Sequence, residues 1–69
     1  MNRDILQGKW RELRGQIKAK WGQLTDDELD EIGGNYDALV GRIQQKYGYA
    51  RDEVERDLES IAADRSSVR

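Results

Sequence analysis

The chain has 69 residues, 36% of them hydrophobic and 38% charged, and a formal net charge of -2 at pH 7. It contains no cysteine and no histidine, which excludes disulfide bonds and the usual nitrogen and sulfur ligands of zinc. A core in so short a chain supplies only about 3–5 kcal/mol of stability, yet two Trp and three Tyr residues can anchor one. We therefore expect one small folded domain rather than a chain that orders only on binding.

The first element along the chain is an amphipathic helix over residues 3–21. Its large apolar residues recur at spacings of four, three, four and four, which places on one helical face Leu6, Trp10, Leu13, Ile17 and Trp21. Gly8 and Gly15 fall nearly opposite this face, where each costs about 1 kcal/mol relative to alanine. We expect close approach of another backbone at Gly15 and a C-terminal cap at Gly22, whereas Gly8 has no evident role.

A second, shorter helix is predicted to begin after Thr25. Thr25 and Glu28 have the spacing of a capping box, in which the hydroxyl accepts from the Glu28 amide and the carboxylate accepts from the Thr25 amide. The acidic residues after the cap suit the positive end of the helix dipole. Leu29 and Ile32 supply an apolar side, and the glycines at 33–34 are expected to end the helix after about two turns.

Two further helices are predicted in the second half of the chain. One begins after Asn35 as its N-cap and ends at Gly48. Its buried face is formed by Tyr36, Leu39, Val40, Ile43 and Tyr47. The other begins after Ala50, and its apolar face is formed by Val54, Leu58, Ile61 and Ala62. Because the apolar pattern ends there, we predict a single domain over residues 1–63 and a mobile tail over residues 64–69.

Residues 8–32 and 34–58 form an internal repeat. Six of the seven glycines fall into two triplets spaced by seven residues and offset by 26: Gly8, Gly15 and Gly22, then Gly34, Gly41 and Gly48. Each repeat reads as a helical hairpin that can bury its apolar face only against the other one. We therefore predict an all-α fold of four short helices, arranged as two pseudo-symmetric helical hairpins that pack as a compact orthogonal bundle.

The net charge hides an alternation between basic and acidic segments. Residues 1–24 carry six basic and two acidic groups, and residues 25–38 carry six acidic and no basic ones. The candidate interaction surface is formed by four cations on one side of the first helix: Arg3, Arg11, Arg14 and Lys18. Beside Trp10 and Trp21, such cations can hold phosphates while the rings stack on bases. The acidic pI near 5.0 and the neighbouring acidic helices favour pairing within the chain instead.

The first helix also has the general pattern of a segment that lies in a membrane interface, since it is basic, amphipathic and contains Trp. Burial in the core explains the same pattern and is favoured. No apolar segment reaches the roughly 20 residues of a membrane span, and the N-terminus lacks the apolar run of a signal peptide. We expect a soluble, cytoplasmic protein.

The carboxylates of the second helix are the other candidates for chemistry: Asp26, Asp27, Glu28, Asp30 and Glu31. In principle they can act as an acid–base pair or bind a hard cation through oxygen. Helix capping and solubility explain them better, because the helix dipole already favours acidic residues there and the D-x-D-x-D-G loop of a calcium hand is absent. We predict no catalytic, cofactor-binding or metal-ligating residues, and no cofactor.

Several motifs carry a resemblance that covers roughly residues 2–59. They are G-x-W-x-x-L-x-G from Gly8, W-G-x-L-T-D-D from Trp21, G-x-x-D-x-L-V-G-x-I-Q from Gly34, and Y-G at Tyr47. Taken together, these motifs resemble the CsbD-like family of small bacterial general-stress proteins. The resemblance implies a small helical domain and stress-linked expression, and it offers no enzymatic activity, ligand or catalytic residue to carry over.

The sequence therefore predicts a non-enzymatic stress-response protein that binds or protects other macromolecules. Its partner is an unknown macromolecule, and pairing into a homodimer is possible. The alternative function is a weak nucleic-acid-binding module that uses the candidate interaction surface, which is possible but not favoured.

Overall fold

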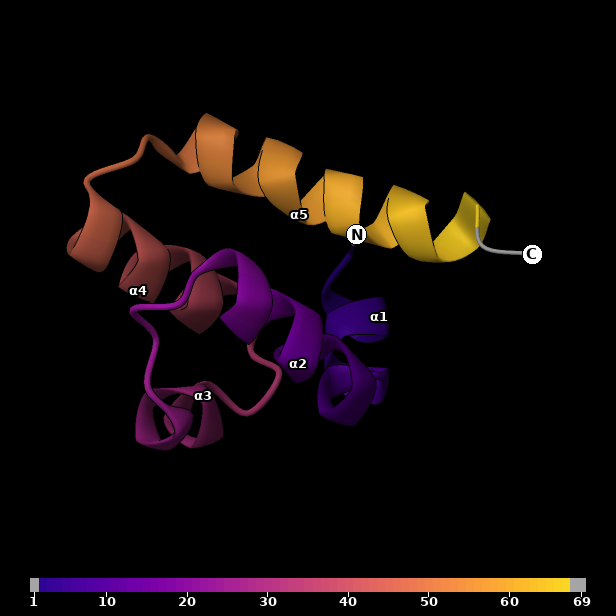
Figure 1. Cartoon of the computed structure of the whole chain (residues 1–69), viewed down its shortest axis with the longest axis horizontal. Coiled ribbons are helices and arrows are strands. Elements are labelled where there is room, and N and C mark those ends of the chain that lie inside the picture. Colours follow the sequence, from indigo (N-terminus) through magenta and orange to yellow (C-terminus); the bar gives the residue numbers. More distant parts are fainter. Residues whose placement is uncertain (1, 68–69) are drawn as a thin grey trace.

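The computed structural model describes the backbone of residues 2–67 and the side chains of residues 2–61. Within that range it contains helices and no strand, which confirms the predicted all-α class. The helices in chain order are α1 (Arg3–Gly8), α2 (Trp10–Lys20), α3 (Asp26–Ile32), α4 (Tyr36–Tyr47) and α5 (Arg51–Ser67), as Figure 1 shows. None of these described helices combines the length and apolarity needed to cross a membrane.

The first predicted helix is divided in two at Lys9, so the described chain has five helices where four were predicted. Lys9 has φ -117° and ψ 22°, outside the helical range, although its amide still donates to the carbonyl of Ile5 at 2.9 Å. The break follows Gly8, the last residue of α1. Because glycine has the lowest helix propensity after proline, Gly8 favours a break in the helix at this point. The sequence alone did not reveal this role.

The predicted helix caps are mostly confirmed. The Thr25 hydroxyl accepts from the Glu28 amide at 3.1 Å while Glu28 Oε1 accepts from the Thr25 amide at 2.9 Å, completing the capping box. Asn35 Oδ1 accepts from the Ala38 amide at 3.0 Å, and Gly48 ends α4 in the left-handed conformation with φ 73°. Since left-handed backbone favours glycine, the identity of Gly48 is explained by the turn it makes.

The prediction that Gly22 caps a helix is wrong. The C-cap of α2 is Trp21, and the glycines with positive φ in the described chain are Gly33, Gly34 and Gly48. The chain turns at this corner through a hydrogen bond from the Leu24 amide to the Trp21 carbonyl at 3.0 Å, which needs no left-handed residue.

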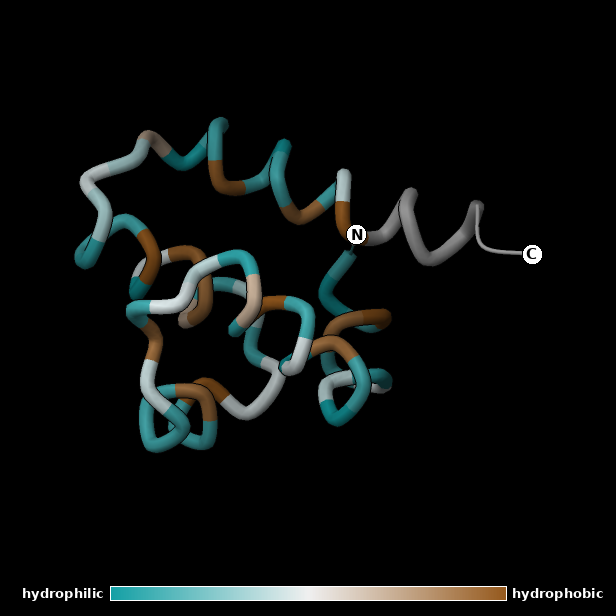
Figure 2. The backbone as a smooth tube through the Cα atoms, viewed as in Figure 1, coloured by the Kyte–Doolittle hydropathy of each residue, from teal (hydrophilic) through white to brown (hydrophobic). Residues whose placement is uncertain are grey.

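The core surrounds α4, which packs against α1, α3 and α5. In Figure 2 the apolar segments of these helices turn toward one another and the hydrophilic segments turn outward. The buried side chains are Leu6, Leu13, Ile17, Trp21, Leu24, Leu29, Ile32, Tyr36, Leu39, Val40, Ile43, Val54, Leu58 and Ile61. Trp10 and Tyr47 pack against this core while partly exposed. The predicted apolar faces therefore meet in one core, with Ala62 lying outside the described side chains.

The arrangement as two pseudo-symmetric hairpins is not confirmed. The helices that end the two repeats differ in length, since α3 has 7 residues and α5 has 17. The backbone of α5 is helical as far as Ser67, past the predicted end of the fourth helix. The domain boundary at residue 63 and the mobility of residues 64–69 stay predictions, and residues 68–69 lie outside the described part of the chain.

The close backbone approach predicted at mid-helix glycines occurs instead at Gly34. A Cβ built on Gly34 would lie 3.1 Å from Gln7 Cα and 3.2 Å from Trp10 Cβ, so the turn before α4 fits against the junction of α1 and α2. At Gly15 and Gly41 a Cβ would meet no atom within 4 Å. Both lie on the solvent side of their helices, which is why the close packing predicted at Gly15 does not occur.

Substitution of Gly34 by alanine should destabilise the fold by about 2 kcal/mol, because φ of +91° strains any L side chain and the new methyl would meet two other residues. Urea unfolding followed by circular dichroism measures this loss. Gly33→Ala is the matched control, since it has a positive φ of +54° but a Cβ contact of only 3.4 Å to the Asp30 carbonyl oxygen. Equal losses in the two variants would show that the contact with α1 and α2 is unimportant.

Candidate functional site

Three of the four cations in the candidate interaction surface form ion pairs within the chain. Arg14 Nη1 lies 2.7 Å from Asp30 Oδ1, and Lys18 Nζ lies 2.6 Å from Asp26 Oδ1. Both pairs join the basic helix α2 to the acidic helix α3. Arg11 is exposed and forms no ion pair with the part of the chain that the structure describes. The structure thus places Arg11, Arg14 and Lys18 on one helix but leaves only the first of them unpaired there.

Arg3, the fourth predicted cation, belongs to a separate cluster where α1, α4 and α5 meet. Its Nη2 atom donates to both carboxylate oxygens of Asp37, at 2.6 Å and 2.7 Å, and Arg51 Nη2 donates to Asp37 Oδ1 at 2.9 Å. The Arg3 guanidinium also lies over the Tyr36 ring, 5.6 Å from its centre. Hydrogen bonds from Arg3 and then Arg51 lower the pKa of the Asp37 carboxyl below its ordinary value. One carboxylate therefore joins three helices.

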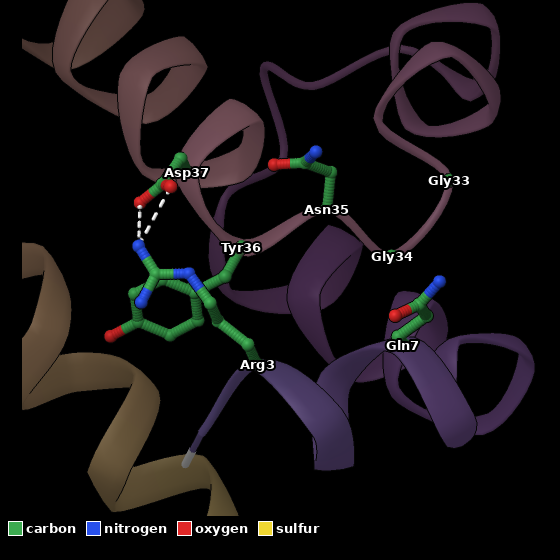
Figure 3. Close-up of a pocket in the computed structure, with 7 residues that line it drawn as sticks. All are labelled: Arg3, Gln7, Gly33, Gly34, Asn35, Tyr36 and Asp37. Atoms are coloured by element: carbon green, nitrogen blue, oxygen red, sulfur yellow. Dashed lines mark hydrogen bonds and ion pairs between the residues drawn. The ribbon is translucent and has the colours of Figure 1, made fainter.

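A hollow of about 320 Å³ opens beside this cluster (Figure 3). It is lined by Arg3, Gln7, Gly33, Gly34, Asn35, Tyr36 and Asp37. Its two charged side chains neutralise each other, and the Asn35 side chain is engaged in capping α4. Burial raises the pKa of the Tyr36 hydroxyl, which keeps that group protonated at neutral pH. The hollow therefore presents no unpaired charge and no group poised for proton transfer.

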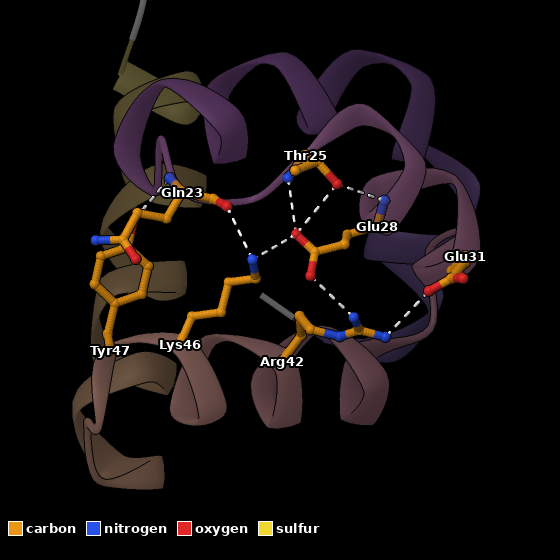
Figure 4. A network of polar contacts seen from close by, with 7 residues as sticks. All are labelled: Gln23, Thr25, Glu28, Glu31, Arg42, Lys46 and Tyr47. Atoms are coloured by element: carbon orange, nitrogen blue, oxygen red, sulfur yellow. Dashed lines mark hydrogen bonds and ion pairs between the residues drawn. The ribbon is translucent and has the colours of Figure 1, made fainter.

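Glu28 is the centre of a second polar network, which joins α3 to α4 (Figure 4). Its carboxylate lies 2.8 Å from Lys46 Nζ and 3.0 Å from Arg42 Nη1, besides accepting from the Thr25 amide. Arg42 reaches on to Glu31, with 3.2 Å between Nη2 and Oε1. The hydrogen bond from Lys46, followed by that from the Thr25 amide, lowers the pKa of Glu28 to about 2. The carboxylate is thus ionised at every physiological pH.

The same network holds the corner between α2 and α3 against the end of α4. Lys46 Nζ donates to the Gln23 carbonyl at 3.2 Å, and the Gln23 amide donates to the Tyr47 hydroxyl oxygen at 3.0 Å. Tyr47 in turn stacks on Tyr49, with ring centres 5.4 Å apart. At this corner, which has no regular secondary structure, both backbone polar groups of Gln23 are thus paired by side chains of α4.

The acidic side chains of α3 pair with cations of the two neighbouring helices. Asp26, Glu28, Asp30 and Glu31 each form an ion pair with a cation of α2 or α4. The hydrogen bond from Lys18 lowers the pKa of Asp26, in the same direction as that of Glu28. In the described chain no group of acidic side chains has the arrangement of a metal site. The arrangement orients the carboxylates toward cations of neighbouring helices.

Sequence reasoning missed Asp37, Arg42, Lys46 and Arg51 as members of these clusters. The available signal was the alternation of basic and acidic segments, which indicated that the helices pair electrostatically. Which cation meets which carboxylate depends on the angle and separation of helices distant in sequence, and no local spacing contains that information.

The sequence pattern of the CsbD-like family matches residues 4–56, which span all of α2, α3 and α4. The chain belongs to the CsbD-like family. This confirms the resemblance that the glycine and aromatic motifs carried.

Curated relatives of this CsbD-like chain match it over most of its length. It is 45% identical over 60 residues to UPF0337 protein YjbJ of Escherichia coli O6:H1, covering 87% of each chain. It is 40% identical to a UPF0337 protein of Pseudomonas aeruginosa, over 90% of this chain and 95% of the relative. A UPF0337 protein of Bordetella pertussis is 48% identical, over 84% of this chain and 88% of the relative. No solved structure matches the chain at a significant level.

Glu28 should make the stability of this CsbD-like domain sensitive to acid. Its folded pKa of about 2 is below its ordinary value of 4.5, so its stabilisation is complete above pH 4.5 and is lost as the pH falls toward 2. Glu28→Gln should lower stability at neutral pH and flatten its decline in acid. Asp26 and Asp37, whose pKa values are also lowered, should leave a residual slope.

Urea midpoints measured from about pH 6 to about pH 3 test this expectation. The matched control is Asp27→Asn, which changes an exposed carboxylate of the same helical turn that forms no ion pair in the described chain. If Glu28→Gln and Asp27→Asn had the same pH profile, the Glu28 network would not contribute to stability.

Proposed function

We propose that this CsbD-like protein is a non-enzymatic, cytoplasmic stress-response protein that acts by contact, binding or protecting other macromolecules. The observation that carries the proposal is family membership, because the matching motifs resemble a family of general-stress proteins. The composition supports it, since a chain with 38% charged residues and a mean hydropathy of -0.98 stays hydrated and soluble beside other macromolecules.

The electrostatics of the carboxylates also support action without catalysis. A general acid that works near neutral pH needs a pKa raised toward that pH. In this chain the pKa values of Asp26, Glu28 and Asp37 are lowered instead, because each carboxylate accepts hydrogen bonds from cations of neighbouring helices. These groups contribute to holding helices together, and none has the environment of a proton donor.

The surface offers a partner charged groups of both signs and few large apolar side chains. Among the described residues, the exposed large hydrophobics are Ile5, at 43% exposure, and Tyr49, at 37%. Two such side chains are too few to form an extended apolar patch of the kind that marks a permanent protein interface. The folded surface is therefore suited to weak and transient contacts.

We expect protection of a labile enzyme by the intact protein. Lactate dehydrogenase activity would be measured after heating and after freeze–thaw cycles, with increasing amounts of the CsbD-like chain. Ubiquitin at equal mass, as a folded protein of similar size, controls for nonspecific effects of added protein. Retained activity that exceeds the ubiquitin control supports the proposal, and equal losses in both samples would contradict it.

The alternative function, nucleic-acid binding, predicts that the chain binds single-stranded DNA, and we expect the opposite result. A nucleic acid would have to displace Asp30 and Asp26 from Arg14 and Lys18, so we expect no binding of labelled single-stranded DNA at low salt. Fluorescence anisotropy is the measurement. Binding that weakens steeply with salt and is lost in the Arg11→Ala, Arg14→Ala double variant would favour the alternative. Lys9→Ala with Lys20→Ala, which removes two other exposed cations, is the charge-matched control.

A further inference from the structure

Two glycines face solvent within helices that carry the core, and no steric reason requires either of them. Gly15 lies in α2 and Gly41 in α4, at equivalent positions of the internal repeat. Both are exposed, and a Cβ on either would meet no atom within 4 Å. Neither has positive φ, since the positive-φ glycines of the described chain are Gly33, Gly34 and Gly48. Alanine would fit both positions without strain.

Glycine in a helix interior destabilises the helix, and no close packing offsets this loss at Gly15 or Gly41. Compared with alanine, each such glycine lowers the equilibrium constant for forming the helix about fivefold, because its unfolded backbone has more freedom to lose. The two positions together therefore favour opening by about 25-fold if their effects are independent. This is a large factor for a domain whose small core leaves little reserve of stability.

The affected helices both carry fully buried side chains of the core. Leu13 and Ile17 of α2 are 1% and 0% exposed, and Leu39 and Ile43 of α4 are both 0% exposed. Because α4 contacts α1, α3 and α5, its loss would remove the support of three other helices. Opening at either glycine would thus convert a hydrophilic surface into one that presents aliphatic side chains between charged ones.

We propose that Gly15 and Gly41 are a built-in conformational device that keeps α2 and α4 close to opening. Under denaturing stress the opened helices present their apolar faces to the exposed apolar segments of partly unfolded proteins. The flanking charges keep the resulting complex soluble. This inference rests on the proposed protective function. The trigger is denaturing stress, and the partner is an exposed apolar segment of a partly unfolded protein.

The first test measures opening by hydrogen exchange in the full chain. In the Gly15→Ala, Gly41→Ala double variant, amides of α2 and α4 should exchange about fivefold more slowly than in the wild type where one helix opens alone, and about 25-fold more slowly where both open together. Gly48→Ala should have the opposite effect, because φ of +73° strains a side chain although its Cβ position is open. Unchanged exchange in the double variant would overturn the proposal.

The second test asks whether protection follows opening. The double variant should protect heated lactate dehydrogenase several-fold less efficiently than the wild type, and Gly48→Ala should protect more efficiently at moderate temperature. Gly41→Ala combined with Gly48→Ala offsets one change by the other within α4 and should restore both exchange and protection to near wild-type values. This variant separates an effect of stability from loss of a contact made by Gly41 itself.

The outcomes separate this inference from the proposed function. A double variant that is more stable yet protects as well as the wild type would overturn the conformational device and leave the protective function standing. A wild-type chain that protects no better than ubiquitin would overturn both. Protection that rises and falls with the exchange rate across the wild type and the three variants would support both.

Discussion

The pairing of basic helices with acidic ones is the constraint on which the rest of this structure depends. Helix α3 has only 7 residues, too few to be stable alone, and it is held by its buried leucine and isoleucine and by cations from two other helices. Glu28 makes two kinds of contact at once. Its carboxylate completes the N-terminal cap of α3 and also accepts from Lys46 and Arg42 of α4. One side chain thus defines where α3 begins and which helix it packs against.

This pairing also limits what the surface can do. Arg14, Lys18 and Arg3 would form a basic surface if the first segment of the chain were considered alone. In the folded chain their charges are directed toward Asp30, Asp26 and Asp37. Exposed ion pairs of this kind each add little stability, and their joint effect is to set the register between helices. They also leave a mixed surface, which suits a protein that stays soluble beside many partners.

The glycines of the repeat are alike in sequence and different in physical role. Gly48 and Gly34 occupy left-handed backbone, and Gly34 also lets the turn before α4 approach α1 and α2. Gly8 marks the break between α1 and α2, whereas Gly15 and Gly41 face solvent with open space around them. A repeat that appears to specify a single packing motif therefore combines turns, a break and two positions that weaken their own helices.

The sequence by itself determined the features that depend on residues close to one another. The Thr25 capping box, the Asn35 cap, the Gly48 stop and the apolar faces are all confirmed, because they follow from hydrogen bonds and periodicity within a few residues. The family was also evident, since its motifs are local strings.

The tertiary structure alone decided the close approach at Gly34 and the partners of each charged side chain. Each depends on where helices distant in sequence meet. Gly34 and Gln7, for example, are brought together only once α4 has packed on α1. Local spacing predicts which face of a helix is apolar, but the distance and angle between two faces are set by the packing of the whole core.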